Sequence, residues 1–97
     1  MFRPSQKELW KLRATADYLF GRGAGEAMFP EGIEVQKSRG RIRQVWFEDK
    51  PICAVRASDG MLVLNRAGAR RLDGFLEFPR RRVVVGEGPG EFIAKGR

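Results

Sequence analysis

The sequence contains no histidine, one cysteine and no long apolar run, and each of these absences excludes a class of protein. Histidine is the usual general base and the commonest metal ligand, so its absence argues against most enzymes. A single cysteine, Cys53, allows neither an intramolecular disulfide nor a cysteine-built zinc site, and its apolar neighbours predict a buried, unreactive thiol. Without an apolar stretch long enough for a membrane span or a secretory signal, we expect a cytoplasmic protein with no membrane partner.

Positive charge is abundant and clustered. The 97 residues include 19 lysines and arginines against 12 acidic residues, which gives a net charge of +7, and fourteen of these cations are arginine. Arginine keeps its charge at physiological pH and presents a planar fork that matches phosphate oxygens. An arginine-rich composition also suits solubility or a hot habitat, but clustering favours a nucleic-acid partner. The clusters are Lys37, Arg39, Arg41 and Arg43; Arg66, Arg70 and Arg71; and Arg80, Arg81 and Arg82.

The N-terminal part of the chain predicts one long helix. Ser5 and Glu8 have the spacing of a capping box, in which each side chain bonds the backbone amide of the other residue. Apolar residues recur at helical spacing after it, at Leu9, Leu12, Ala16 and Leu19 or Phe20. Gly21 is expected to end the helix, and residues 24–29 to add one further turn with Met28 and Phe29 in the core.

From Ile33 the pattern alternates with period two and predicts an antiparallel meander of about four strands. The expected strands are residues 33–37, 41–47, 52–56 and 61–64, joined by short turns. Strict alternation in the second strand would place Arg41, Arg43, Val45 and Phe47 on one face, with Ile42, Gln44 and Trp46 on the other. A short helix over residues 66–72, capped by Asn65, follows.

The last part of the chain suggests a further unit. Residues 80–85 read as a charged lead into a buried valine strand, residues 86–90 as a glycine loop, and residues 91–95 as the start of a helix. Two placements are open, since these residues either pack back on the first sheet or begin a second domain that the chain does not complete.

Catalytic and nucleotide-binding motifs are weak. Neither glycine-rich stretch, residues 21–25 or 86–90, has the G-x-G-x-x-G spacing or the P-loop ending. The carboxylate pairs Glu31 with Glu34 and Glu48 with Asp49 fall in expected turns, where nothing separates their pKa values. We therefore expect no enzymatic activity, no cofactor and no metal.

Several short sequence segments resemble the domain that precedes the PUA domain in archaeal tRNA-guanine transglycosylase and its archaeosine-synthase relatives. The most specific is Leu12 to Gly25 followed by Met28-Phe29-Pro30, and weaker matches follow in the same order. The tail, Arg82 to Val85 and Phe92 to Gly96, resembles the opening strand and helix of the PUA domain itself. The resemblance implies a pre-PUA domain over residues 1–79 and an incomplete PUA domain over residues 80–97. It further implies an accessory, tRNA-gripping region in an archaeal tRNA-modification protein, with Phe92, Lys95 and Gly96 at the edge of an RNA groove.

Together these observations predict an α+β fold, in which a long and a short helix pack on an antiparallel sheet of about four strands before a partial PUA-like β-α extension. The function we expect is non-catalytic binding of structured RNA, with tRNA as the expected partner. The alternatives are a protein-interaction or dimerisation module that docks on a tRNA-modification enzyme, and a general nucleic-acid binder. The residues expected to contact RNA are Arg39, Arg41, Arg43, Arg70, Arg71, Arg80, Arg81, Arg82 and Lys95.

Overall fold

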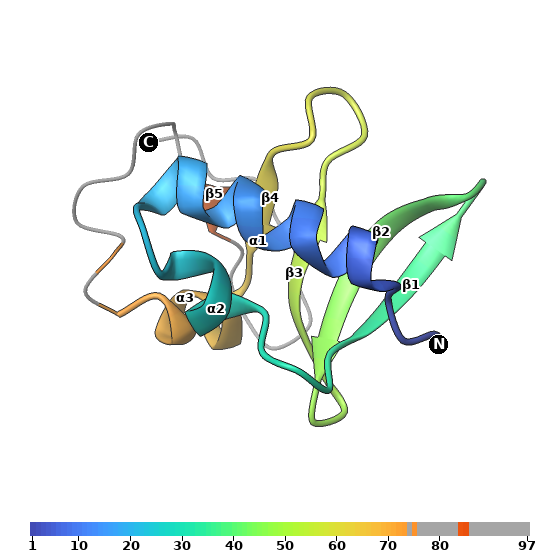
Figure 1. Cartoon of the computed structure of the whole chain (residues 1–97), viewed down its shortest axis with the longest axis horizontal. Coiled ribbons are helices and arrows are strands. Elements are labelled where there is room, and N and C mark those ends of the chain that lie inside the picture. Colours follow the sequence, from blue (N-terminus) through green and yellow to red (C-terminus); the bar gives the residue numbers. More distant parts are fainter. Residues whose placement is uncertain (74, 76–83, 86–97) are drawn as a thin grey trace.

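The computed structural model describes residues 1–73, 75, 84 and 85, and this part of the chain has the expected α+β architecture. Its elements, in chain order, are α1 (Gln6–Phe20), α2 (Ala24–Met28), β1 (Glu34–Ser38), β2 (Arg41–Phe47), β3 (Lys50–Val55), β4 (Leu62–Leu64), α3 (Arg66–Arg71) and β5 (Val84–Val85). The strands form one sheet in sequence order, and α1 crosses it in the view of Figure 1.

Helix α1 begins and ends where the sequence predicts. The Ser5 hydroxyl accepts from the Glu8 amide at 3.1 Å, and the Glu8 carboxylate accepts from the Ser5 amide at 2.9 Å. The predicted apolar stripe is buried, because it packs against the sheet. Gly21 ends the helix with φ +119°, a backbone conformation that favours glycine. The capping box and the apolar period thus fix this element locally.

Two tight turns shape the antiparallel meander. Ser38 pairs with Arg41 and Phe47 pairs with Lys50, so each hairpin has a two-residue turn. All four turn residues have positive φ, Arg39 and Gly40 in the first turn and Glu48 and Asp49 in the second. This is the geometry that matches the right-handed twist of the flanking strands.

A bulge in β2 interrupts the predicted alternation of its side chains between the two faces of the sheet. Val35 pairs with Val45, whereas Lys37 pairs with Ile42, so β2 has one more residue than β1 between these pairs. Because cross-strand partners share a face, Ile42 and Val45 both lie on the core side, although they are three residues apart. The expectation that Ile42 faces away from Val45 was wrong, since the extra residue at Arg43 shifts the phase of the strand.

The core lies between α1, the two short helices and one face of the sheet. Met28 and Phe29 are completely buried in it, as predicted. Helix α3 begins at Asn65, whose buried side chain accepts from the Gly68 amide at 2.9 Å and donates to the Pro51 carbonyl at 2.5 Å. Asn65 therefore caps α3, as predicted, and also ties it to the first residues of β3.

Strand β5 extends the same sheet. Val84 and Val85 pair in parallel with Val63 and Leu64 of β4. Of the two placements open for this segment, this pair therefore lies on the first sheet. The expected boundary between residues 79 and 80 lies outside the described residues, so the partial PUA domain stays a prediction.

In the part of the chain that the structure describes, no helix combines the length and apolar character that a bilayer crossing requires.

Candidate nucleic-acid interface

The predicted arginine clusters lie at two separate places. Arg39, Arg41 and Arg43 belong to the β1–β2 hairpin, whereas Arg70 and Arg71 end α3 on the far side of the molecule (Figure 1). Arg80, Arg81, Arg82 and Lys95 lie outside the described residues. The hairpin cluster is the larger described group.

Arg71 already has partners within the fold. Its Nε donates to the Met28 carbonyl at 3.3 Å, and its guanidinium lies 4.5 Å from the centre of the Phe47 ring. A cation over an aromatic face is an attractive contact, so Arg71 links α3 to both α2 and β2. We expect this side chain to stabilise the fold, whereas its neighbour Arg70 is exposed.

A groove of about 400 Å³ lies between α1, the start of β2 and the loop that joins β3 to β4. In Figure 1 that loop extends past α1 at the top of the view, and the tip of the β1–β2 hairpin extends past it at the right. Apolar side chains line part of the groove, among them Leu12, Ile42, Val55 and Leu62. Its cations are Lys11, Arg41, Arg43 and Arg56.

The carboxylates around the groove are already paired. Glu8, which lines the groove, forms an ion pair with Lys37 at 2.7 Å, and Asp59 forms one with Arg56 at 2.7 Å. Among the described residues, no carboxylate forms an ion pair with Lys11, Arg41 or Arg43. These three cations therefore give the groove a positive potential that no described acid neutralises.

The two ion pairs lower the pKa of both acids. The pKa of Glu8 is lowered chiefly by its hydrogen bond to Lys37 and then by the Ser5 amide. The pKa of Asp59 is lowered to about 2, first by its hydrogen bonds from Arg56 and then by the Met61 amide. Both carboxylates are consequently charged, and engaged by their partners, at neutral pH.

The loop from Arg56 to Gly60 holds the Arg56 side chain in a fixed plane. Its Nε donates to Asp59 Oδ1 at 3.0 Å and its Nη2 to Asp59 Oδ2 at 2.7 Å, which is a two-pronged contact. Asp59 Oδ1 also accepts from the Met61 amide at 3.0 Å, and the Gly60 amide donates to the Arg56 carbonyl at 2.8 Å. The loop is thus closed by its own hydrogen bonds.

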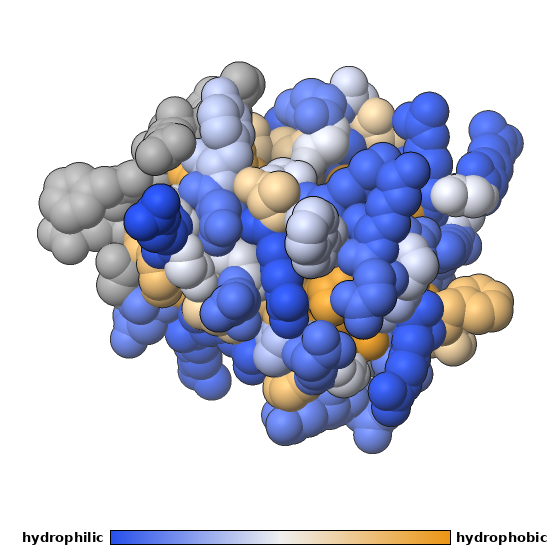
Figure 2. Space-filling model, viewed as in Figure 1, coloured by the Kyte–Doolittle hydropathy of each residue, from blue (hydrophilic) through white to orange (hydrophobic). Residues whose placement is uncertain are grey.

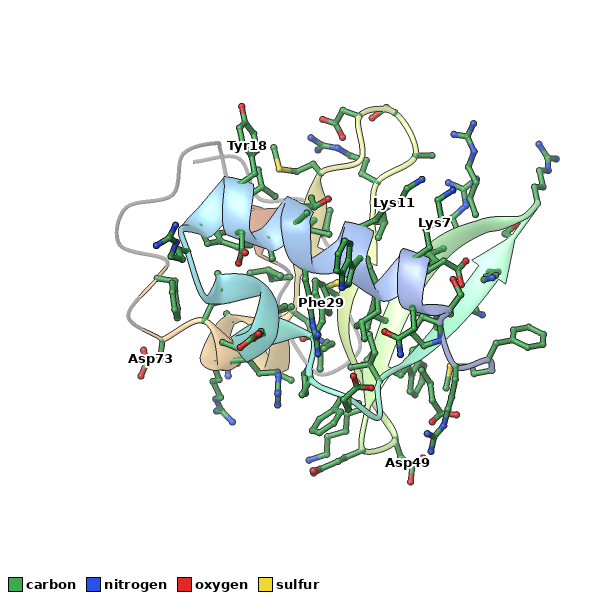
Figure 3. All side chains as sticks on the ribbon, viewed as in Figure 1. Lys7, Lys11, Tyr18, Phe29, Asp49 and Asp73 are labelled. Carbon is green, nitrogen blue, oxygen red and sulfur yellow. The ribbon has the colours of Figure 1, made fainter. Side chains whose placement is uncertain are left out.

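Sequence reasoning missed two of the groove cations, Lys11 and Arg56. Lys11 follows Lys7 by one helical turn outside the apolar stripe of α1, a signal that was present in the sequence. Figure 3 shows both lysines on the part of α1 nearest the hairpin. Figure 2 shows that hydrophilic side chains cover most of this face, with apolar surface exposed in patches between them. Nothing local in the sequence brings Arg56 to the same groove.

A second group of polar residues of α1 has a structural role. Asp17 Oδ1 accepts from the Gly25 amide at 2.7 Å, and Arg13 Nε donates to the Phe29 carbonyl at 2.8 Å. One turn of α1 therefore binds both ends of α2. A Cβ atom at Gly25 would collide with the Arg13 backbone, so only glycine permits this approach. Arg13, Asp17 and Gly25 all lie in the string that carried the family resemblance.

Cys53 is completely buried, as predicted, and burial raises the pKa of its thiol. Because the thiolate is the reactive form, this side chain is chemically inert under ordinary conditions.

Comparison with known proteins agrees with the resemblance. Residues 10–79 match the family described as the patch-forming domain C2 of tRNA-guanine transglycosylase. The chain belongs to this family. The match runs from within α1 through α3, so the α1–α2 contacts and all groove residues except Glu8 fall within it.

Archaeal relatives of the C2 domain are much longer than this chain. This chain is 44% identical over 92 residues to the tRNA-guanine(15) transglycosylase of Methanothermobacter thermautotrophicus. The matched region covers 93% of the chain and 14% of that enzyme. The same enzyme of Pyrococcus abyssi is 47% identical over 85 residues, 87% of the chain and 14% of the relative. That of Thermococcus kodakarensis is 41% identical over 96 residues, 98% of the chain and 17% of the relative. The chain thus corresponds to an accessory domain of these enzymes and spans about one sixth of their length or less.

Proposed function

We propose that this C2 domain is a non-catalytic RNA-binding module that contacts tRNA. The observation that carries the proposal is the set of three groove cations, Lys11, Arg41 and Arg43, that no described carboxylate neutralises. Arg39 adds a fourth cation in the adjacent turn. The name of the relatives supplies the partner, since they are enzymes that act on tRNA. A tRNA partner implies a cytoplasmic location and an accessory role in tRNA modification.

The expected strength of the electrostatic contribution follows from counterion release. If Lys11, Arg39, Arg41 and Arg43 each meet one phosphate, the logarithm of the binding constant should fall with a slope of about −3.6 against the logarithm of salt concentration. Affinity would then decrease about 150-fold between 50 and 200 mM salt. Such contacts position the RNA without reading its sequence, so we expect selectivity for shape over sequence.

The experiment is a titration of labelled tRNA with the 97-residue chain at 50, 100 and 200 mM salt, with duplex DNA as competitor. The double variant Arg41→Ala/Arg43→Ala should weaken binding at 50 mM salt and flatten the slope by about 2 units. The matched control is Arg3→Ala/Arg22→Ala, which removes the same charge at two exposed positions outside the predicted RNA-binding set and should change the slope less.

The outcomes separate the proposal from its alternatives. A steep slope with poor competition by DNA supports a module that selects RNA by shape. Equal competition by DNA indicates a general nucleic-acid binder. Binding that is absent at 50 mM salt, or a slope that the Arg41→Ala/Arg43→Ala variant leaves unchanged, would remove the hairpin from the RNA interface and favour a domain that docks on protein.

The partial PUA extension remains part of the proposal. Arg80, Arg81 and Arg82, which precede β5 in the sequence, would add phosphate contacts, and Lys95 would contribute to the RNA groove that the PUA resemblance implies. Variants at these positions should flatten the salt slope further, because each removes one phosphate contact. An unchanged slope would confine the RNA interface to the hairpin side of the domain.

A further inference from the structure

The groove combines two features that a phosphate-binding surface alone does not need. Its floor includes Leu12, Ile42, Val55 and Leu62, of which Leu62 is almost completely buried in the core. Its volume of about 400 Å³ is in the range of sites that hold small organic molecules. A continuous duplex presents its phosphates and sugars to a protein and keeps its bases stacked inside, so it would leave such a floor unused.

The cations of the groove divide into two kinds. Lys11, Arg41 and Arg43 are not neutralised by any described acid and suit a phosphate. Arg56 is neutralised by Asp59, which holds both Nε and Nη2. The charge of Arg56 is therefore satisfied, while its guanidinium plane is held in one orientation.

The Arg56 side chain remains partly accessible. Its side chain is 38% exposed although it is paired, and the residue lines the groove. Unstacked RNA bases commonly stack on guanidinium planes as well as on aromatic rings. An arginine whose edge is fixed by a carboxylate is preorganised for such stacking, because little side-chain freedom is left to lose on binding.

We infer that this groove binds one unpaired nucleotide of RNA, with its base stacked on the Arg56 guanidinium over the apolar floor and the neighbouring phosphates of the strand held by Lys11, Arg41 and Arg43. The inference rests on the proposed RNA-binding function and specifies the class of RNA, which is a single-stranded or looped-out segment. The Arg56–Asp59 pair acts in it as a stacking surface and contributes little to the salt dependence.

The test compares three RNA probes at equal salt with the 97-residue chain. The probes are a single strand of about eight nucleotides, the same strand annealed to its complement, and an abasic ribose-phosphate strand of equal length. Electrostatics alone would favour the duplex, which has the higher charge density. We expect the single strand to bind about fivefold or more tightly than both other probes, because only it offers an unpaired base.

The variant that isolates the stacking surface is Arg56→Lys, which keeps the charge and can still pair with Asp59 but lacks the plane. It should weaken single-strand binding about fivefold or more and leave the salt slope unchanged. The matched control Arg66→Lys, at the exposed start of α3, should leave single-strand affinity unchanged. Equal binding of the single strand and the abasic strand, or an Arg56→Lys variant with wild-type affinity, would overturn the inference.

Failure of this inference can be told apart from failure of the proposed function. If tRNA binds with a steep slope while the abasic strand binds as well as the single strand, the phosphate cluster is sufficient and only the nucleotide site is wrong. If neither tRNA nor the single strand binds at 50 mM salt, both proposals fall.

Discussion

The Asp17 carboxylate accepts a 2.7 Å hydrogen bond from the backbone amide of Gly25, and this contact connects α1 to the first turn of α2. The amides of a first helical turn have no partner within their own helix, and here a side chain of another element supplies the acceptor. Arg13, one turn earlier on α1, binds the Phe29 carbonyl at the other end of α2. The segment that identified the family therefore encodes a helix–helix contact, whereas the cations of the RNA interface that we propose lie outside it.

Replacing Asp17 should destabilise the domain without affecting RNA contacts. Asp17→Ala leaves the Gly25 amide without its acceptor in a part-buried position, which should lower the free energy of unfolding by about 2 kcal/mol. Urea denaturation followed by circular dichroism measures the change. Glu26→Ala on the exposed side of α2 is the control and should shift stability by about 0.5 kcal/mol or less. Equal effects of the two variants would show that the Asp17 contact is not specifically stabilising.

Gly68 is required by the close approach of α3 to β3. A Cβ atom there would collide with the Ile52 carbonyl oxygen, a backbone atom that cannot move aside cheaply. Gly68→Ala should therefore destabilise the domain by about 1–3 kcal/mol, although alanine favours a helix over glycine by about 1 kcal/mol. Thermal or urea unfolding measures whether the Gly68→Ala variant is less stable or more stable than the wild type. A stabilised Gly68→Ala variant would mean that α3 lies farther from β3 than we describe, and Arg70→Ala provides a reference for an exposed change on the same helix.

The variants Arg71→Ala and Arg70→Ala should show which of the two arginines contributes to the stability of the fold and which is available for RNA binding. Arg71→Ala removes both the hydrogen bond to Met28 and the contact with the Phe47 ring, so the free energy of unfolding should fall by about 1–2 kcal/mol. Arg70→Ala should leave stability nearly unchanged, because its side chain is exposed. Parallel urea unfolding and tRNA titration of both variants provide the measurement. A flattened salt slope in Arg71→Ala without any loss of stability would return Arg71 to the RNA interface.

Asp59 should remain charged far into the acid range. Its pKa is lowered to about 2 by Arg56 and the Met61 amide, so the folded form holds this proton less tightly than the unfolded chain does. The stabilisation from the pair is therefore complete above the ordinary aspartate pKa and is lost as pH falls through about 2. Titration of the Asp59 carboxyl carbon by NMR measures the value directly. Arg56→Gln should move the midpoint up toward the ordinary range, and an unmoved midpoint would assign the shift to another cause.

Sequence determined the elements of this fold because their signals are local. A capping box, an apolar period of 3.6 and an Asn N-cap fixed α1 and α3, and alternation with short turns predicted the meander of β1 to β4. The number of arginines, fourteen in 97 residues, and the clustering of most of them directed attention to phosphate. The family resemblance followed from one string near the N-terminus.

Only the tertiary structure decided which side chains meet. The bulge at Arg43 turns Ile42 to the core side, and a single extra residue leaves no mark on composition or period. Lys11 and Arg56 are 45 positions apart and line one groove because α1 crosses the sheet beside the β3–β4 loop. Arg71, by contrast, contacts the Phe47 ring and donates to the Met28 carbonyl within the fold, so its side chain is engaged there. Charge is a property of each residue, whereas its availability depends on the partners that packing brings within reach.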